Sequence, residues 1–360
     1  MKDKYINDVI CVPINCSKDF EAIQSKWKKL EKGKDMTVFQ SIEWNILLFN
    51  EWRQSKYEKL FSNVEVYIAE VNGQEMILPV IVQKHSTKLR NFCGRNAGIY
   101  ILGQGSYSDY LNVVYDEFCE ETFILLLKYV RKKHPNLKVF FSNIREDTRI
   151  CNYLLKNYTI ISEGVSVSIH IPSNIDEYNN NLSKHTKQNL RTALNRIKKD
   201  SMKYKLINRS NITDLATIDE MINIHMKRIK TKNYNNDDFI HKISSQIRIK
   251  ILNNKEIYNN IIRESMLNMR DSFTLLVELN DKIVGYIYGI KDNNNVVRIM
   301  QNCVDEDYKY YSPMFRGIYD YIIESISKEN GLKEIDFTRG DEEYKYKLGG
   351  RDTKLYDFEL

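Results

Sequence analysis

Several chemical signatures are missing from this sequence, and each absence excludes a class of protein. Its six cysteines form no C-x-x-C pair and no metal-ligand set with the scattered histidines, so we expect free thiols, a reducing cytoplasm and no bound metal. The start, MKDKYINDVICVPINCSKDF, has no apolar core long enough for a signal peptide. The best apolar run, Phe123–Leu127, is far too short for a membrane span. No G-K-[ST] follows the glycine-rich stretch Gly94–Gly105, which argues against a phosphate-binding loop.

Composition and charge are those of an ordinary globular protein. The 360 residues are 42% hydrophobic and 28% charged, and this length fits two domains. Lys and Arg number 54 against 48 Asp and Glu, which gives a formal charge of +6 spread along the chain. Such a mild excess suits anionic small molecules such as coenzyme A or nucleotide sugars as well as it suits nucleic acid.

The last third of the chain has a clear order of elements. Three predicted strands, separated by Asn and Asp turns, cover Phe273–Leu279, Ile283–Ile290 and Val296–Val304. Ser312 is a favourable N-cap and Pro313 a favourable first helical residue, so we expect a helix through Asn330. A further strand, Lys333–Phe337, completes the order strand, strand, strand, helix, strand.

The stretch Gly331–Gly350 contains that last strand and a dense cluster of titratable side chains. Alternation places Ile335 and Phe337 on one face of the strand and Asp336 on the other. A carboxylate at a strand end, followed by a flexible charged turn, is typical of a functional site. The alternative is a solvated loop after an edge strand.

In combination these features resemble the GNAT acyltransferase superfamily, and within it the CelD/BcsL-type branch related to the Fem-type peptidoglycan aminoacyltransferases. That branch carries a D-F-x-x-G-x-E-x-Y-K motif, matched here by Asp336, Phe337, Gly340, Glu342, Tyr344 and Lys345. It also begins the preceding helix with S-P-G, where this chain has Ser312, Pro313 and Met314. The pyrophosphate loop common in GNAT proteins, R/Q-x-x-G-x-G/A, is absent from the sequence.

Other segments extend the resemblance along the chain. An F-Q-[ST]-x-x-W segment ends at Trp44, and an S/A-D-Y segment contains Asp109 and Tyr110. The family's basic helix is matched by 183–199, with Lys187 and Arg191, and its H-x-x-R pair by His225 and Arg228. Core packing of Trp44 and solvent exposure of the basic helix are the competing interpretations.

The two halves of the chain also resemble each other. In the first half, a strand and a helix stand between the segments YIAEVNGQEMILPVIV, which has a hairpin turn at Asn72–Gly73, and PNLKVFFSNIRED. In the second half, the same order of elements stands between LLVELNDKIVGYIYGI and NGLKEIDFTRGDE. We therefore expect an α/β (α+β) protein of two tandem GNAT-like domains, 1–171 and 172–360, each a mixed twisted sheet flanked by helices. Further helices are expected over Asp237–Ile251 and Asn254–Met269, and a closing strand over Lys354–Leu360.

The resemblance implies how an acyl-CoA donor is held, with no metal. Two central strands of the fold splay apart, and the exposed backbone of the third strand holds pantetheine; the corresponding residues are Gln301, Asn302, Cys303 and Val304. The positive end of the helix after Ser312, with Met314 and Arg316, is then expected to bind pyrophosphate. Cys303 as a covalent nucleophile is a weaker option, because no histidine is near it in sequence.

The remaining candidates serve the acceptor and the proton transfers. An amine must lose a proton and the departing thiolate must gain one. Asp336, His225 or Glu342 is the candidate base, directly or through water, and Tyr344 the candidate acid. Candidates for acceptor binding are Lys345, Arg228, Asp109, Tyr110, Trp44, Lys187 and Arg191.

The sequence predicts a cytoplasmic acyl-CoA-dependent N-acyltransferase, a monomer or homodimer without membrane span or nucleic-acid partner. The resemblance implies a nucleotide-linked amino sugar acceptor, for example a dTDP-linked 3-amino-3,6-dideoxyhexose, destined for surface polysaccharide such as O-antigen or capsule. One alternative is Fem-type aminoacyl transfer from tRNA to a peptidoglycan precursor. A second is a non-catalytic protein that binds nucleic acid or polysaccharide. The acyl chain, the sugar, the nucleotide and the base are not determined by the sequence.

Overall fold

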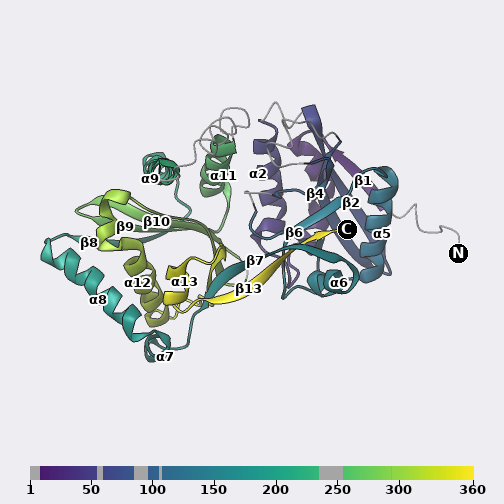
Figure 1. The fold of residues 1–360 in the computed structure, drawn as a ribbon. Helices are drawn as coiled ribbons and strands as arrows, with labels where there is room; N and C mark the ends of the chain where they lie inside the picture. The colour runs from purple at the N-terminus through teal and green to yellow at the C-terminus, as the bar shows by residue number, and fades with distance from the viewer. Residues whose placement is uncertain (1–8, 55–59, 85–95, 105–107, 235–253, 293) are drawn as a thin grey trace. The chain divides into compact units, whose positions relative to one another are not determined.

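The computed structural model describes residues 9–54, 60–84, 96–104, 108–234, 254–292 and 294–360 (Figure 1). Contacts divide the chain into two units. The first comprises the described parts of 1–164, 248–261 and 354–360, and the second those of 165–247 and 262–353. Neither unit is a contiguous stretch, and the domain boundary between 171 and 172 stays a prediction. The helix expected over Asp237–Ile251 lies outside the described residues.

The first unit is built on a mixed sheet with the strand order β1-β2-β3-β4-β6-β13, with β5 paired to β3. Neighbouring strands are antiparallel except β4 and β6, which run parallel. The β2–β3 hairpin turns at Asn72 and Gly73, both at positive φ, as the Asn-Gly pair predicts. The strands β1 to β6 and β13 span Val9–Ile14, Ser62–Val71, Gln74–Gln83, Gly98–Ile101, Val114–Tyr115, Val139–Arg145 and Arg351–Glu359.

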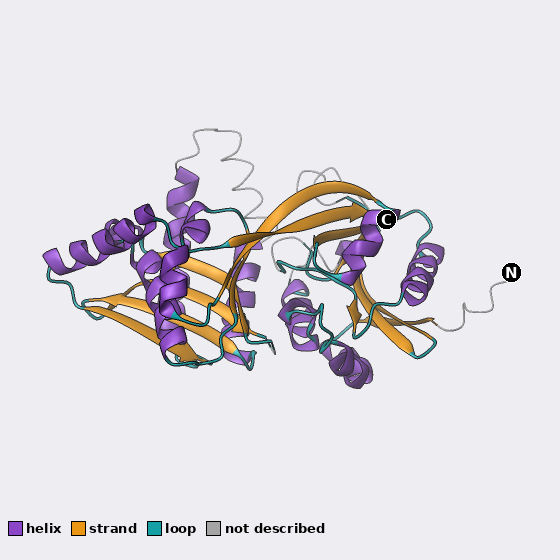
Figure 2. Cartoon of the chain, turned by 90° about the horizontal axis from the view of Figure 1, so that it is seen from below, coloured by secondary structure: helices purple, strands orange, loops and turns teal. Residues whose placement is uncertain are grey.

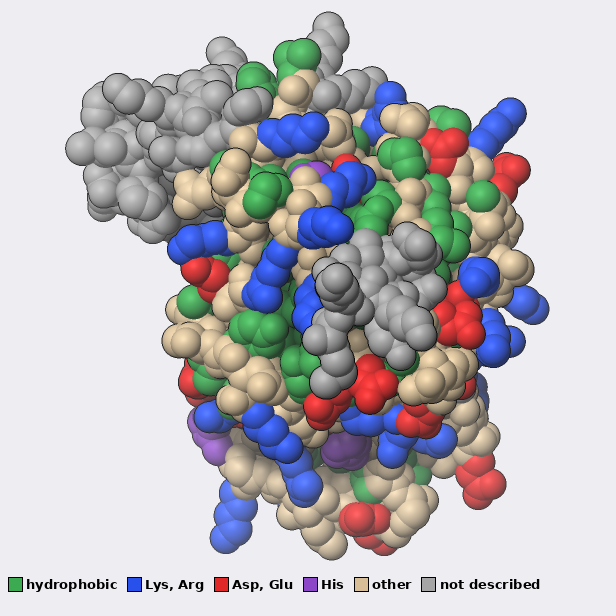
Figure 3. Space-filling model, turned by 90° about the vertical axis from the view of Figure 1, so that its right-hand side faces the viewer, with side chains coloured by type: hydrophobic (Ala, Val, Ile, Leu, Met, Phe, Trp, Pro, Cys, Tyr) green, Lys and Arg blue, Asp and Glu red, His purple; other side chains and the backbone are tan. Residues whose placement is uncertain are grey.

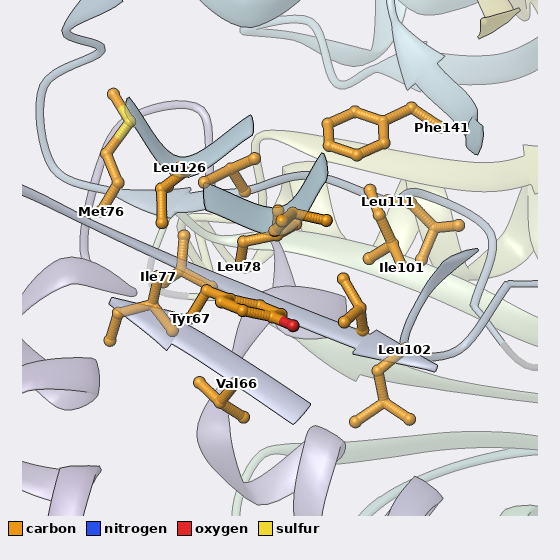
Figure 4. Packing of buried hydrophobic residues seen from close by; sticks show 14 of the residues in the cluster. Val66, Tyr67, Met76, Ile77, Leu78, Ile101, Leu102, Leu111, Leu126 and Phe141 are labelled. Atoms are coloured by element: carbon orange, nitrogen blue, oxygen red, sulfur yellow. The ribbon is translucent and has the colours of Figure 1, made fainter. Parts of the chain in front are cut away.

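Helices cover this sheet and enclose the first core. They include α1 (Gln24–Leu30), α2 (Ile42–Trp52), α5 (Glu120–Lys133) and α6 (Arg149–Asn157), with the short 3-10 turns Ser17–Ile23 and Val38–Gln40. Helix α5 packs on β2 and β3. Figure 4 shows how Tyr67, Leu78 and Phe141 pack together with other buried apolar side chains from several strands. Since all three are fully buried, they contribute to the stability of this unit.

The second unit is a mixed sheet with the order β7-β12-β11-β10-β9-β8. All neighbours are antiparallel except β11 and β12, which run parallel. The strands β7 to β12 span Thr159–His170, Tyr204–Ser210, Ser272–Leu279, Lys282–Lys291, Val296–Val304 and Glu334–Arg339. Those predicted from Phe273 to Val304 and over Lys333–Phe337 are therefore confirmed to within a few residues.

Helices lie on both faces of the second sheet (Figure 1), and Figure 2 shows the same strands and helices from below. On one face are α7 (Ile175–Asn181), α8 (Lys184–Lys199) and α12 (Pro313–Ser327), whose apolar side chains share a core with the sheet. On the other are α9 (Leu215–Tyr234), which packs on β10 and β11, and the C-terminal part of α11 (Asn254–Asn268), where Ser265 contacts Tyr288 of β10. The 3-10 turn Glu306–Tyr311 precedes α12, and the short helix α13 (Glu343–Lys347) follows β12.

Both sheets follow one order of pairings, as the internal repeat predicted. In each, four strands form an antiparallel series, a helix (α5 or α12) leads to a parallel strand, and an antiparallel strand completes the sheet. The completing strands are exchanged along the chain: β7 follows β6 in sequence but pairs with β12, whereas β13 follows β12 but pairs with β6. The predicted closing strand at the C-terminus is thus present, and it closes the first sheet.

Candidate functional site

The strands β11 and β12 pair over only part of their length. Their parallel ladder joins Val296–Arg298 to Glu334–Asp336, and among the described residues it goes no further, although β11 continues to Val304. Thr338 marks the point of separation, because its φ of +54° is a conformation that β-branched residues rarely adopt. Its hydroxyl donates to the carbonyl oxygen of Ile299 at 2.9 Å, in place of the next ladder bond. The predicted splay is therefore present.

A β-bulge lies at the same level of the sheet. Tyr288 pairs with Gln301 but Gly289 pairs with Ile299, so Met300 is an extra residue in β11. A Cβ at Gly289 would collide with the carbonyl oxygen of Arg298, which explains the glycine inside a predicted strand. Before the bulge, Ile299 joins the core under α12; after it, Gln301 contacts α9. The bulge thus re-aims the following side chains, as bulges near functional sites do.

Helix α9 brings the predicted histidine–arginine pair onto the unpaired half of β11. His225 and Arg228 are one helical turn apart, so both point to the same strand. The Nδ1 atom of His225 is hydrogen-bonded to the side-chain amide nitrogen of Gln301. Arg228 donates to the carbonyl oxygen of Asn302, and its Nη1 lies 3.9 Å from Sγ of Cys303. The sequence did not place these two side chains on β11; only the helical spacing indicated that they face together.

Tyr344 reaches the same half of β11 from α13. The side-chain amide of Asn302 donates to the Tyr344 hydroxyl at 2.9 Å, so the hydroxyl keeps its own proton for another acceptor. Burial is the main cause that raises the pKa of Tyr344 to about 12, although the hydrogen bond from Asn302 acts in the opposite direction. The phenol is therefore protonated throughout the neutral pH range.

The turn between β12 and α13 is held by Lys345. Its buried ammonium donates to the carbonyl oxygens of Phe337, Arg339 and Gly340 at 3.2, 3.0 and 2.9 Å. It also pairs with the Glu342 carboxylate at 2.8 Å. Partial burial acts to raise the pKa of Glu342, but the hydrogen bond and charge of Lys345 outweigh it, so the pKa lies below its usual value. Lys345 thus stabilises the turn. Its ammonium is already bound to oxygen atoms of that turn, and its expected contact with the acceptor stays a prediction.

Asp336 lies on the face predicted by alternation, but its carboxylate is already engaged. It is 2% exposed and forms an ion pair with Arg298, which also pairs with Asp292 at 3.0 Å. Its Oδ1 accepts the Thr338 N–H at 2.8 Å. These contacts hold the backbone where β11 and β12 separate. The geometry therefore favours a structural contribution of Asp336 over the base that alternation alone indicated.

The start of α12 agrees with the expected N-cap, with one difference. Ser312 precedes Pro313, but it has φ of +49° and its side chain makes no capping hydrogen bond. Met314 points into the core, where a Cβ at Gly285 would lie 2.7 Å from its Cγ. Arg316 is bound to Asp320, with Nε to Oδ2 at 2.8 Å. Of this group, the backbone at the positive helix end is what can contact an anion.

The candidates in the first unit lie mostly in its core. Trp44 is 1% exposed and its Nε1 donates to Ser108 Oγ at 2.9 Å, so the core interpretation is the better one. Tyr110 is 2% exposed and packs edge-on against Phe39, 5.8 Å between ring centroids. Asp109, which immediately precedes Tyr110, is half-buried. Large aromatic residues at these positions satisfy packing before they can contact a substrate.

Basic side chains do not gather on the one face that Figure 3 draws. On the face drawn in Figure 3, Lys and Arg side chains are mixed with Asp and Glu and form no continuous basic surface. In α8, Arg191 is exposed and Lys187 is half-buried, while Arg196 donates to the carbonyl oxygen of Tyr310 at 2.7 Å. Within the described ranges, no helix is long and apolar enough to cross a membrane. The same residues contain no His, Cys, Asp and Glu cluster arranged to hold a metal ion.

Comparison with known proteins agrees with this geometry. Residues 184–346 match the family model of the acetyltransferase (GNAT) domain. This segment is a GNAT acetyltransferase domain. The chain is accordingly an acyltransferase, and the GNAT domain contains both the separation of β11 from β12 and the side chains around it. A GNAT domain implies an acyl-CoA donor. No curated protein matches the sequence.

Solved structures resemble the chain beyond the GNAT domain. A conserved protein of unknown function from Bacteroides thetaiotaomicron has a TM-score of 0.56 at 12% identity, covering 94% of this chain and 97% of that one. FemX has a TM-score of 0.47 at 12% identity, covering 94% and 96%. A tandem GNAT protein from the clavulanic acid biosynthesis pathway has a TM-score of 0.46 at 9% identity, covering 98% of each chain. The first of these shows a shared fold across both units.

Proposed function

We propose that the chain is an acyl-CoA-dependent N-acyltransferase that acylates the amino group of a nucleotide-linked sugar, such as a dTDP-linked 3-amino-3,6-dideoxyhexose, for surface polysaccharide. The observation that carries the proposal is the unpaired half of β11, with His225, Asn302 and Tyr344 gathered on it. The family resemblance suggests the sugar acceptor. Fem-type transfer from aminoacyl-tRNA is the second candidate.

In this proposal the donor lies along the unpaired half of β11. Backbone groups of 301–304 hold the pantetheine arm, as an additional strand would, because β12 does not pair with them. The backbone at the start of α12 receives the pyrophosphate at the positive end of the helix dipole. Met314 and Arg316 support that helix end through packing and the Asp320 ion pair rather than by direct contact.

The reaction is direct attack of the amine on the thioester carbonyl. The C–N bond forms, negative charge develops on the carbonyl oxygen, and the C–S bond then breaks to release the thiolate. Tyr344 is protonated at neutral pH and supplies a proton or a hydrogen bond to the thiolate. Glu342 is ionised at neutral pH and accepts the amine proton, directly or through water. A nucleotide diphosphate acceptor would be favoured by the basic residues Lys187 and Arg191 of α8.

The proposal is tested by an assay for released thiol. The protein is mixed with a panel of acyl-CoA donors and nucleotide-linked amino sugars, and with aminoacyl-tRNA plus a peptidoglycan precursor as the competing pair. Thiol release that depends on the amino sugar, with an N-acylated sugar detected by mass spectrometry, supports the proposal. Aminoacyl-tRNA releases no thiol, so transfer in that mixture is followed by mass spectrometry of the precursor. Transfer only there would replace the proposal with Fem-type activity.

Replacing Tyr344 with phenylalanine should lower kcat by about 10- to 100-fold, with the Kd for CoA nearly unchanged. This is the low end of general acid catalysis, because a thiolate is already a good leaving group. Steady-state kinetics and calorimetry with CoA measure the two effects. The control is Tyr346→Phe, which removes the hydroxyl of an exposed tyrosine in the same helix. Equal losses in both variants would contradict a direct contribution of the Tyr344 hydroxyl.

A further inference from the structure

The side chain of Gln301 lies between a buried tyrosine and the histidine of the site. The Tyr286 hydroxyl donates to Oε1 of Gln301, and the amide nitrogen of Gln301 is hydrogen-bonded to Nδ1 of His225. Tyr286 is 0% and Gln301 6% exposed, so neither side chain exchanges this partner readily for water. The sequence pattern indicated a role only for the backbone of Gln301 and none for Tyr286.

The direction of these hydrogen bonds determines where His225 carries its proton. Because Oε1 accepts from Tyr286, the amide NH2 group is the part of Gln301 that faces the ring. An NH2 group can only donate, so Nδ1 must accept, and the neutral ring carries its proton on Nε2. Protonation of Nδ1 would set two donors against each other, which opposes the imidazolium form.

Charges around His225 also oppose the imidazolium form of its ring. Arg228 lies one turn further along α9, facing the same strand, and a neighbouring cation disfavours a second positive charge. Other titratable groups on the facing strands include Tyr286, Tyr288 and Cys303, and Tyr344 lies across β11. The carboxylate of Glu342 interacts electrostatically with Lys345 and Arg228, and both cations lower its pKa. The cationic ring is therefore opposed by both hydrogen bonding and charge.

We infer that Gln301 and Tyr286 are positioning residues that hold His225 as the neutral tautomer with its proton on Nε2. A ring in this state donates a hydrogen bond and is a poor base, because Nε2 already carries a proton and the Nδ1 lone pair is used by Gln301. In the proposed function, on which this consequence rests, His225 would donate to the carbonyl oxygen of the thioester and not remove the amine proton. The tautomer itself does not depend on that function.

The tautomer is measured by NMR on the full chain labelled with 15N-histidine. The chain contains 6 histidines, and the ring signals of His225 are identified by their loss in His225→Gln. We expect a protonated Nε2 and an unprotonated Nδ1 at neutral pH. A protonated Nδ1 in the wild-type protein would overturn the inference. This measurement requires no acyl transfer. A wrong tautomer can therefore be distinguished from a wrong proposed function.

Two variants and a matched control test the positioning residues. Gln301→Glu replaces the donor with a carboxylate, so Nδ1 of His225 should become protonated. Tyr286→Phe leaves the amide free to rotate and should give a mixture of both tautomers. Tyr288→Phe also removes a buried hydroxyl from β10, but one that bonds to Ser265 at 2.8 Å, and should leave the His225 signals unchanged. Unchanged signals in Gln301→Glu, or equal changes in both tyrosine variants, would overturn the inference.

Discussion

The His225→Ala variant should have a kcat about 10²–10³-fold below that of the wild-type enzyme, with little change in the Kd for CoA. Loss of one preorganised donor to a developing oxyanion has an effect of this size. The donor is preorganised here because Gln301 holds the ring against β11. Steady-state kinetics with the sugar acceptor, together with calorimetry for CoA, would measure both quantities.

Replacement by glutamine separates the two roles that His225 could have. Glutamine still offers an N–H donor but cannot take up a proton, so His225→Gln should keep a larger share of kcat than His225→Ala if the histidine is a donor. If the histidine is the base, both variants should be equally slow. His170→Ala is the control, because the side chain of His170 is 67% exposed on β7 and forms an ion pair with Glu334. A kcat of His225→Ala equal to that of this control would refute any role in turnover.

The Asp336→Ala variant should unfold more easily, with a free energy of unfolding lower by about 3–5 kcal/mol. Breaking a buried ion pair by removing one partner costs this much, because the other charge stays buried. Arg298 would lose this ion pair, and the Thr338 N–H at the kink would lose its acceptor. Urea denaturation, followed by circular dichroism, would show a lower midpoint at an unchanged slope.

An exposed ion pair provides the comparison for Asp336. Asp307 pairs with Lys227, but its side chain is 67% exposed, so Asp307→Ala should cost less than about 1 kcal/mol. The prediction for Asp336→Ala would be contradicted by a variant that is as stable as the wild-type protein but has no turnover. That outcome would restore Asp336 as the candidate base, as its position on the strand first indicated.

Local patterns were sufficient to predict most elements around the site. Ser312 and Pro313 defined the start of α12, and alternation in Lys333–Phe337 correctly separated Asp336 from its apolar neighbours. The partner of Asp336 could not be predicted, because Arg298 lies 38 positions away and meets it only through the register of two parallel strands. Propensity and periodicity describe one element at a time and carry no information about register.

The same limit applies to residues whose role depends on their surroundings. Lys345 belongs to a motif with titratable neighbours, but its ammonium is used by carbonyl oxygens of its own turn. The side chain of Gln301 gains its importance only because the bulge at Met300 turns it toward α9. A bulge is one extra residue in one of two paired strands. It can be recognised only when both strands and their register are known.

The exchange of β7 and β13 has a consequence for synthesis of the protein on the ribosome. The sheet of the first unit is completed by residues 351–359, which are translated after all the strands of the second unit. While the intervening chain is being translated, β6 has no antiparallel partner and presents an open edge to other nascent chains. The first unit therefore begins to fold early but reaches its complete sheet only after the second unit has been synthesised.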